Sequence, residues 1–503
     1  MTALIRGQVQ YYADAITNVN VTGLADGAAI IGKGRNAVGD GGGGLFRYVA
    51  SSSQAVDGGT VFAPAVGSGR IFRDGWTVLG FNGDLMVQDF GVVPGAFDAG
   101  TLAANDTALA NARTWLAANT NAGKLKFPAG TYGYNTSPNW AINHARVLAD
   151  GEVRLRCYGS GTGVILDAGS GSQNVYDVTF GTPGNPFIIE MAGTGAHACF
   201  VRAIHHSCIA IKPRSAGAGG AGILINFAVC TDFYFTCSVN EDGGWYGGAG
   251  GKPTYGINAT QRGAGEQVSY CNFYNPIIEG VGTGIYLDYA IGNTFYSGTA
   301  EGCSTGGVFE SANAARNRFI GMDMEVNTSY DVDSAGLATV IDGCDTNKLI
   351  TFRGNDQTVR NGVHSQITIT NAALFARLRD LRYNRLNNGS TVSDNGTQTT
   401  KDNVVNYVTG KIDAAQVPNV TNYGVAVSAP AAPSSGTAWQ NTNTYPVEVI
   451  FSGGSISNIQ YSRDNVTYYS VTGTTNGAAV RLAPGDWFKP TYTGSPNFVV
   501  VPM

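Results

Sequence analysis

The hydrophobic and polar positions between residues 271 and 333 repeat in three similar units. Each unit has an asparagine just before a phenylalanine and a glutamate six residues after it, and Phe273, Phe295 and Phe319 are spaced 22 and 24 residues apart. A second short apolar segment begins five residues after each glutamate. A repeat in the low twenties, with alternating strands and glycines at the corners, is typical of one turn of a β-solenoid. The pattern therefore predicts an all-β fold built on the stacked coils of a parallel β-helix.

The spacing of the repeat has a chemical consequence. Equivalent residues in successive coils lie about 4.8 Å apart, the distance between paired strands. Glu279, Glu301 and Glu325 are therefore expected to form a column on one outer face, with Asp323 two positions before Glu325 on the same face. We predict that these four carboxylates are the catalytic residues.

The remaining chain divides into parts by the same kind of pattern. We expect an N-terminal β-module with glycine-punctuated strands (1–85), the β-helix (86–386), a polar connector (387–424) and a small C-terminal β-sandwich for trimerisation or carbohydrate binding (425–503). Several short strands separated by turn residues indicate the sandwich.

Two segments have helical spacing. We expect Asn105 or Asp106 to cap a helix that runs to about Ala118 and covers the open end of the solenoid, where unpaired strand edges invite aggregation. One helical face of this segment is formed by Leu109, Ala112 and Leu116. Leucines also recur in residues 371–386, which predicts either a short helix or neck at a trimer axis or a plain cap on the solenoid.

Composition agrees with an all-β protein and excludes some functions. The 503 residues include 70 glycines, about twice the usual share, and only 13% are charged. A net charge of −5 without a basic cluster argues against a nucleic-acid partner. No apolar run reaches the roughly 20 residues that cross a bilayer, and the N-terminus lacks a signal-peptide pattern. We expect synthesis in the cytoplasm and release by another route, such as cell lysis.

The eight cysteines show no CxxC pair and no metal-ligand spacing. Most lie in apolar strand contexts, which predicts buried free thiols that act as small hydrophobes. No clustered aspartates suggest a calcium site, so we expect no metal and no cofactor.

Several further residues are candidates for substrate binding. A long glycine-rich insertion interrupts the coils between residues 241 and 256, and such insertions on a regular scaffold commonly carry function. Its aromatic rings are suited to sugar rings, unless they pack back on the solenoid. The predicted substrate-binding residues are Glu241, Asp242, Trp245, Tyr246, Tyr274 and Tyr296. In the C-terminal part, Trp439 and Trp487 are expected to pack in the core rather than bind sugar.

Motifs in residues 38–134 resemble a known family. Their order is Gly-Gly-Gly-Gly-Leu-Phe-Arg-Tyr, Gly-Gly-Thr-Val-Phe-Ala-Pro, Asp-Phe-Gly, Asn-Asp-Thr-Ala-Leu and Phe-Pro-Ala-Gly-Thr-Tyr. This order resembles the opening of bacteriophage tailspikes of the pectate-lyase-like β-helix superfamily. The resemblance implies a right-handed β-helix in a homotrimeric virion protein on the phage tail. Such a protein binds, and usually cleaves, bacterial surface polysaccharide such as capsule or O-antigen. The resemblance also implies that residues 1–85 dock on the tail or an adaptor protein. No active-site motif transfers by position.

The carboxylate column fits glycoside hydrolysis, which uses one carboxyl group as acid and a second on water or on the sugar. Adjacent members of the column, such as Glu301 and Glu325, lie about 5 Å apart, the spacing of retaining enzymes. Asp323 and Glu325, two residues apart on one strand, lie nearly 7 Å apart, closer to the inverting spacing. Other possibilities are a site elsewhere between coils or subunits, and a hydrogen-bonded ladder without chemistry.

Two alternatives to hydrolysis stay open. A polysaccharide lyase needs cations on a substrate carboxylate and a base, and the basic residues near the coils are Arg202, His205, His206, Lys212 and Arg214. A non-catalytic receptor-binding spike would hold the polymer with the same aromatic and acidic side chains. We favour an endo-acting glycoside hydrolase.

Overall fold

The computed structural model describes residues 10–502 apart from several gaps. The gaps are residues 75, 78–79, 82–83, 120–123, 170–172, 195–196, 218, 241–244, 246–250, 371–375, 380–381, 384–391, 395–399, 403–404, 407–432, 443–445 and 472–478. The chain forms two compact units: Met1–Gln398 with Val405–Lys411, and Thr399–Val404 with Ile412–Met503.

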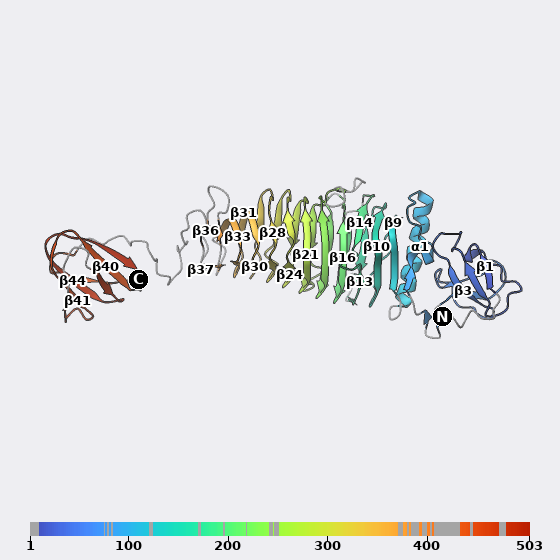
Figure 1. Ribbon diagram of the computed structural model, residues 1–503, viewed down its shortest axis with the longest axis horizontal. Coiled ribbons are helices and arrows are strands. Elements are labelled where there is room, and N and C mark those ends of the chain that lie inside the picture. Colours follow the sequence, from blue (N-terminus) through green and yellow to red (C-terminus); the bar gives the residue numbers. More distant parts are fainter. Residues whose placement is uncertain are drawn as a thin grey trace. The chain divides into compact units, whose positions relative to one another are not determined.

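The first unit begins with a five-stranded sheet in the order β1-β2-β3-β5-β4 (Figure 1). Its strands are β1 (Gln10–Ala13), β2 (Ala29–Gly32), β3 (Gly44–Val49), β4 (Val61–Phe62) and β5 (Arg70–Arg73). The 3₁₀ helix η1 (Ile16–Asn18) lies between β1 and β2 in the chain, and β6 (Trp76–Thr77) and β7 (Gly80–Phe81) form a hairpin after β5. Ile16, Ile30, Phe46 and Ile71 form the centre of its core. This is the compact β-module that the glycine punctuation predicts.

A buried ion pair joins this sheet to the solenoid. Arg73 lies 3.0 Å from Asp89, and both side chains are about nine-tenths buried. Asp89 belongs to the 3₁₀ helix η2 (Val87–Phe90), which follows β8 (Asp84–Met86), the first strand of the parallel ladder. Arg35 also donates to the Asp89 carbonyl at 2.7 Å. The Asp-Phe-Gly motif thus supplies the carboxylate that holds the two parts together.

The helix α1 (Ala99–Ala118) lies at the start of the coil stack, next to β9 (Lys124–Tyr134) (Figure 1). The prediction of its N-cap was wrong, because Asp98 caps the helix by accepting from the Thr101 N–H at 2.9 Å. Asn105 is instead buried inside the helix, where its amide donates to the Gly133 carbonyl at 2.8 Å. The predicted apolar face, with Leu109, Ala112 and Leu116, is buried.

The body of the first unit is the predicted parallel β-helix, because each strand pairs in parallel with the equivalent strand one coil later. The first face contains β10 (Arg146–Cys157), β13 (Thr179–Phe180), β14 (Phe187–Met191), β16 (Cys208–Pro213), β18 (Asp232–Ser238), β21 (Asn272–Glu279), β24 (Thr294–Tyr296), β25 (Thr299–Glu301), β27 (Arg318–Ile320), β28 (Asp323–Met324), β30 (Val340–Asp342), β31 (Asp345–Phe352), β32 (Thr358–Arg360) and β33 (Val363–Ile369). The second face contains β11 (Val164–Asp167), β15 (Cys199–His205), β17 (Ala221–Val229), β19 (Tyr255–Ala259), β22 (Thr283–Leu287), β26 (Gly306–Glu310) and β29 (Tyr330–Ser334), joined by the ends of β31 and β33. A short third face is made by β12 (Val175–Tyr176), β20 (Val268–Ser269) and β23 (Ala290–Ile291).

A bend divides each coil of the first face into two segments. At this bend Asn275 and Ser297 have the left-handed φ angles 46° and 56°. The first segment carries the repeated phenylalanines, and the second segment carries the repeated glutamates. Because the backbone turns here, the outer side chains of the two segments form separate columns.

The repeated phenylalanines stack inside the solenoid, as the sequence predicts. The ring centroids of Phe273 and Phe295 are 4.4 Å apart and those of Phe295 and Phe319 are 5.0 Å apart, with nearly parallel planes. Phe233 extends the stack at 4.8 Å from Phe273. All four side chains are almost completely buried.

A buried carboxyl group also lies in the solenoid core. Glu310 is fully buried and accepts hydrogen bonds from Asn317 (2.9 Å), Ser334 (2.5 Å) and Thr339 (2.7 Å). Burial raises the pKa of Glu310, against the lowering effect of these donors. The pKa of this carboxyl group is therefore higher in the folded protein than in the unfolded chain, where it is 4.5. Its contribution to stability is fully present below pH 4.5 and is lost as the pH rises through the pKa of the folded state.

We therefore expect Glu310→Gln to flatten the dependence of Tm on pH. The amide keeps the acceptor for Asn317 and donates to the two hydroxyl groups, so no buried partner is lost. The melting temperature of the variant should match the wild type at pH 4 and exceed it by a few degrees at pH 8. Parallel profiles for the two proteins would show that Glu310 keeps one protonation state across this range.

The end of the solenoid differs from one expectation. In residues 371–386 the described residues form short strands rather than a helix: β34 (Arg377–Arg379) pairs with β32, and β35 (Arg382–Tyr383) pairs with β33. The coils continue through β36 (Val392–Asp394), which pairs with β33, and β38 (Val405–Asn406), which pairs with β35. The short strand β37 (Thr400–Asp402) belongs to the second unit. Parallel pairing thus extends beyond the phenylalanine repeat and into the expected connector.

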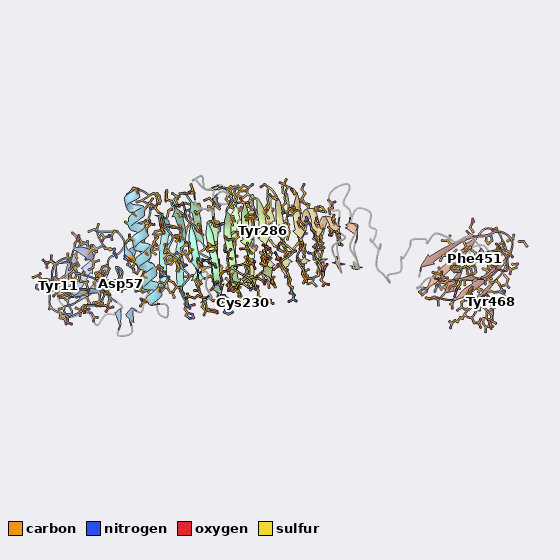
Figure 2. All side chains as sticks on the ribbon, turned by 180° about the vertical axis from the view of Figure 1, so that it is seen from behind. Tyr11, Asp57, Cys230, Tyr286, Phe451 and Tyr468 are labelled. Atoms are coloured by element: carbon orange, nitrogen blue, oxygen red, sulfur yellow. The ribbon has the colours of Figure 1, made fainter. Side chains whose placement is uncertain are left out.

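The second unit contains the antiparallel sheets of the predicted β-sandwich. One sheet has the order β39-β44-β41-β42 and the other β43-β40-β45. Their bounds are β39 (Trp439–Gln440), β40 (Val447–Ser452), β41 (Ser455–Ser462), β42 (Tyr469–Val471), β43 (Ala479–Leu482), β44 (Trp487–Gly494) and β45 (Asn497–Pro502). Phe451 (Figure 2), Phe488 and Phe498 lie in its core, and Trp439 packs on Phe488, with 5.4 Å between their ring centroids.

All eight cysteines lie in described parts of the chain and all are free thiols. Six are buried, as expected. Cys208 is partly exposed, and Cys230 is exposed at a corner of the coil, which corrects the expectation for these two residues (Figure 2). Cys230 has a left-handed φ of 49°, so its side chain leaves the apolar interior.

Candidate active site

The predicted carboxylates share the second segment of the first face. Glu279 pairs in register with Glu301. The Gly302 N–H donates to the Glu325 carbonyl at 3.0 Å, which continues the column by one coil. Asp323 is in register with Thr299, one column to the side. All four side chains are partly exposed, so the structure brings the predicted group together on one surface.

Glu301 lies at the electrostatic centre of this group. Partial burial raises the pKa of Glu301, and the charges of Glu279, Asp323 and Glu325 raise it further. The pKa of Asp323 is also raised, first by burial and then by Glu325 and Asp345. Neighbouring negative charges disfavour ionisation, so Glu301 and Asp323 keep their protons to a higher pH than isolated carboxyl groups do.

Glu279 is held in place by the preceding coil. Its Oε2 accepts a very short hydrogen bond from the Ser238 hydroxyl and a second bond from the Asn240 amide at 2.9 Å. Ser238 is in register with Glu279, so the serine occupies the same column one coil earlier. This carboxylate therefore has a fixed orientation beside Glu301.

The same columns carry cations in the earlier coils. Arg156 is in register with Glu190, and the column continues through Arg214 and Ser238 to Glu279. The neighbouring column begins with Arg154 and contains Lys212. We call these two columns the charged strip. Its members in coil order are Arg156, Glu190, Arg214, Ser238, Glu279, Glu301 and Glu325 in one column, and Arg154, Ile188, Lys212, Thr236, Ile277, Thr299, Asp323 and Asp345 in the other.

The five basic residues considered for a lyase do not gather at one place. Lys212 and Arg214 are on the charged strip, and Arg214 is buried. Arg202 is on β15 of the second face, where it forms a two-bond pair with Asp167 at 2.5 and 2.6 Å. His205 at the end of β15 is buried, which lowers its pKa, and His206 is exposed at the following corner.

Tyr274 and Tyr296 lie on the outer side of the first segment, across the bend from Glu279 and Glu301. Their ring centroids are 5.4 Å apart with an 11° angle between planes, and Tyr234 stacks on Tyr274 at 5.2 Å. The rings therefore cover one another's faces. The surface they offer consists mainly of ring edges and hydroxyl groups, with Tyr296 38% exposed.

The candidates Glu241, Asp242 and Tyr246 lie outside the described residues. Trp245 is described and is partly exposed. The second insertion, residues 261–266, is fixed by Arg262, which pairs with Glu266 and donates to the Gln173 carbonyl at 3.1 Å. Two loops from distant coils are thereby tied together.

The sequence reasoning missed two acidic residues. Asp345 continues the Asp323 column, but no phenylalanine repeat marks its coil. Asp331 is fully buried and accepts hydrogen bonds from the Asn327 amide (2.8 Å) and from the N–H groups of Asn347 (2.8 Å) and Lys348 (2.6 Å). Burial is the main cause that raises the pKa of Asp331, to about 6. The short spacing from Asn327 to Asp331 was the only signal for it.

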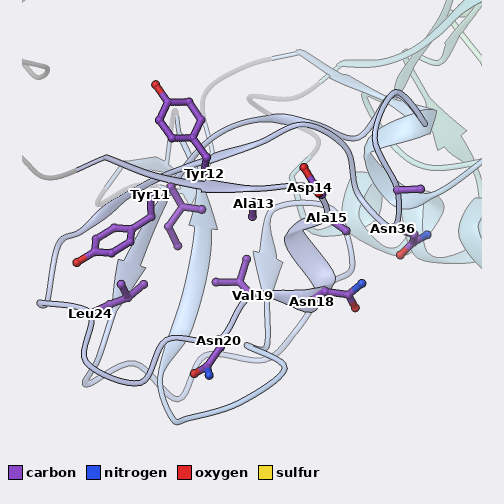
Figure 3. A pocket seen from close by; sticks show the side chains of 12 residues that line it. Tyr11, Tyr12, Ala13, Asp14, Ala15, Asn18, Val19, Asn20, Leu24 and Asn36 are labelled. Atoms are coloured by element: carbon purple, nitrogen blue, oxygen red, sulfur yellow. The ribbon is translucent and has the colours of Figure 1, made fainter.

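Two hollows lie elsewhere on the first unit. One of about 350 Å³ in the N-terminal module is lined by Tyr11, Asn18, Asn20 and Leu24 (Figure 3). The other, of about 600 Å³, lies beside the corner residues His144, Asp177, His206 and Cys230. Neither includes the predicted carboxylates.

Within the described parts of the chain, no cluster of three or more His, Cys, Asp or Glu side chains is arranged to hold a metal ion. The described helices include none that is long and apolar enough to cross a membrane.

The fold matches phage tailspike structures over nearly the whole chain. The tailspike protein of Acinetobacter phage vB_ApiP_P1 is 16% identical, with 99% of this chain and 98% of that chain covered and a TM-score of 0.51. Tailspike protein 2 of the Escherichia coli O157:H7 bacteriophage CAB120 is 14% identical, with 97% and 77% covered and a TM-score of 0.51. The chain has the fold of a phage tailspike. The resemblance seen in the N-terminal motifs is thus confirmed at the level of structure.

A further similar structure is the tailspike protein gp49 of Acinetobacter baumannii bacteriophage Fri1, which is named a capsular polysaccharide depolymerase. It is 12% identical, with 97% of both chains covered and a TM-score of 0.46. No protein-family model matches the sequence, and no curated protein matches it either. The tailspike fold supplies the scaffold, and the chemistry depends on this chain's own residues.

Proposed function

We propose that this protein is a phage tailspike that cleaves bacterial surface polysaccharide by glycoside hydrolysis on the charged strip. The observation that carries the proposal is the position of Glu301 among three other carboxyl groups, which together with burial raise its pKa. A glycosidase needs a carboxylic acid that is still protonated near neutral pH and an ionised carboxylate beside it. The tailspike fold and its resemblance to polysaccharide-binding phage proteins support this assignment.

In the proposed mechanism, Glu301 donates its proton to the oxygen of the glycosidic bond as that bond breaks. Glu279, oriented by Ser238 and Asn240, is the second carboxylate. The two residues are paired on adjacent strands, and a spacing of about 4.8 Å is the one that favours retention of configuration. In this arrangement Glu279 attacks the sugar, and Glu301 then removes a proton from the water that releases the product.

The tyrosines across the bend are proposed to bind the sugars next to the cleaved bond. Tyr274 and Tyr296 belong to the same coils as Glu279 and Glu301. Their stacked rings form a rigid edge, and their hydroxyl groups are suited to sugar hydroxyls.

The test is to incubate the purified protein with purified bacterial capsule or O-antigen and to analyse the products. We expect new reducing ends without the ultraviolet absorbance of an unsaturated uronate. Reducing ends with that absorbance would mean elimination by a lyase. Polymer that is bound and stays intact would mean a non-catalytic receptor-binding spike.

The assembly is proposed from the same resemblance. We infer a homotrimer on the phage tail that acts at the host surface, attached to the tail or to an adaptor protein through residues 1–85. The buried Arg73–Asp89 pair supports a firm connection between the N-terminal module and the catalytic coils.

A further inference from the structure

The hollow of about 600 Å³ at the corner of the first coils, here called the corner hollow, lies outside the charged strip. One of its sides is formed by the corner residues of four successive coils: His144, Asp177, His206 and Cys230 (Cys230 is labelled in Figure 2). The N–H of each of the first three donates to the carbonyl just before the next corner residue, at 2.9–3.1 Å. All four have left-handed φ angles between 48° and 59°, and their side chains are exposed. This corner therefore presents a column of mainly polar side chains to solvent.

The other side of the corner hollow lies two residues further along each coil and consists of Arg146, Thr179, Cys208 and Asp232. These four residues pair in register from strand to strand. Val178 and Ser207, buried between the two columns, also line the hollow. Four coils include three strand spacings, or about 14 Å, and ligand sites commonly have volumes of about 300–1,000 Å³. The hollow thus has the size and the elongated shape of a site for a short stretch of polymer.

The lining offers hydrogen-bonding groups that the protein holds in place. His144 Nδ1 lies 3.1 Å from Asp177 Oδ2, and Asp232 Oδ1 accepts from the Asn272 amide at 2.9 Å. A carboxylate has about four acceptor sites, so each aspartate can accept further bonds from the hydroxyl groups of a ligand. The Thr179 hydroxyl, between these coils, both donates and accepts. Acceptors and donors so close together suit a sugar ring, whose hydroxyl groups do both.

The corner hollow is continuous with the stacked tyrosines. Tyr234 follows Asp232 by two residues on β18, so both side chains project from the outer side of one strand. Burial raises the pKa of Tyr234, and the nearby Cys208 and Asp232 raise it further. Tyr234 stacks on Tyr274, and the stack continues to Tyr296 in the coils of the predicted catalytic residues. A glycan that runs along this stack from the cleaved bond therefore reaches the hollow at the coil of β18.

We propose that the corner hollow is a remote subsite, which binds a sugar unit of the substrate polymer through its hydroxyl groups. This inference rests on the proposed function. The coil of Glu301 is two strand spacings, about 10 Å, beyond the coil of Asp232. The six residues from Asp232 to Ser238, which shares the column of Glu301, add at most about 20 Å across the face. The bound sugar is thus several units from the cleaved bond, so the subsite lowers KM and leaves kcat unchanged.

Cys230 allows polymer in the hollow to be detected directly, because its thiol is exposed whereas six of the eight cysteines are buried. The ligands are purified bacterial capsular polysaccharides and O-antigens, and the protein carries Glu301→Gln so that they stay intact. Those that bind in affinity electrophoresis are then present while a maleimide alkylates the protein, and peptide mass spectrometry follows Cys230. At a polymer concentration about ten times Kd, we expect alkylation to slow about tenfold. A cysteine placed at the half-exposed Lys33 (Lys33→Cys) is the control and should react equally with and without polymer.

A variant that fills the hollow gives the second measurement. Thr179 is partly exposed on the outer side of β13, and Thr179→Tyr should weaken polymer binding and raise KM by about tenfold. The shortest fragments that are still cleaved do not reach the hollow, so their KM should be unchanged. Thr358→Tyr is the matched control, because Thr358 is partly exposed in the same column several coils later. Melting temperatures show that both variants are folded.

Four results would overturn the inference: binding of no polymer in the panel, equal alkylation of Cys230 with and without bound polymer, a folded Thr179→Tyr protein that binds like Thr358→Tyr, or an altered oligomeric state of Thr179→Tyr in light scattering with polymer binding kept. The last result would mean that a second copy of the chain fills the hollow. Failure of the proposed function looks different. In that case Glu301→Gln still cleaves the polymer, while the effect of Thr179→Tyr on KM is measured as before.

Discussion

We expect Glu301→Gln to lower kcat for polysaccharide cleavage by about 100- to 10,000-fold, the contribution of a general acid. The amide has the shape of the carboxyl group but has no acidic proton to give to the leaving oxygen. The side chain lies on the outer surface of β25, and its replacement removes a carboxyl from a crowded group. Folding and polymer binding should therefore be unchanged, while product formation falls.

The measurement is the initial rate of reducing-end formation at saturating polymer, with melting temperature and polymer binding as checks. Glu448→Gln is the matched control, because Glu448 is a carboxylate of the second unit that pairs with Arg481 at 3.1 Å. Normal cleavage by both Glu301→Gln and Glu325→Gln would place the active site elsewhere on the protein.

The pH profile gives a second readout of the same site. Activity requires protonated Glu301, so kcat should fall as the pH rises through the raised pKa of this residue. Glu325→Gln removes one of the negative charges that raise this pKa, so the alkaline limb of the profile should move to lower pH. An unmoved limb would mean that another group donates the proton.

The sequence was sufficient for the parts of the fold that repeat at short distance. Phe273, Phe295 and Phe319 are 22 and 24 residues apart, and buried residues that recur at this period are typical of the stacked strands of a solenoid. The register of Glu279 with Glu301 follows from the register of these phenylalanines, because both lie in the same coils. Candidate carboxylates were therefore predictable as neighbours.

Long-range register was not predictable. Ser238 and Glu279 are paired although 41 residues separate them, because a long insertion lies between their coils. The repeat is interrupted by this insertion, so the sequence did not predict that Lys212 and Arg214 lie in the same columns as the acidic residues. In residues 371–386 the spacing of the leucines predicted a helix where the structure has strands. Leu378 lies in a three-residue strand and pairs with Val359, and such a strand is too short for an alternating pattern to appear in the sequence.

The physical basis of this register leads to the second large effect. We expect Phe295→Ala to lower the free energy of unfolding of the first unit by about 3–5 kcal/mol. Phe295 is fully buried between Phe273 and Phe319, at 4.4 and 5.0 Å between ring centroids. Its removal leaves a cavity that stacked strands cannot close, because hydrogen bonds to both neighbouring coils fix the backbone of β24. The measurement is urea-induced unfolding followed by circular dichroism.

Phe309→Ala is the matched control, since it makes the same chemical change in the next strand but one of the chain. Phe309 lies on the outer side of β26, is partly exposed and stacks on Tyr286 at 5.1 Å between ring centroids. An exposed position loses less apolar burial and leaves no closed cavity, so its cost should be clearly smaller. Equal losses at the two positions would mean that the interior stack does not set the stability of these coils. The register that holds Glu279 beside Glu301 would then depend on the strand hydrogen bonds rather than on the buried phenylalanines.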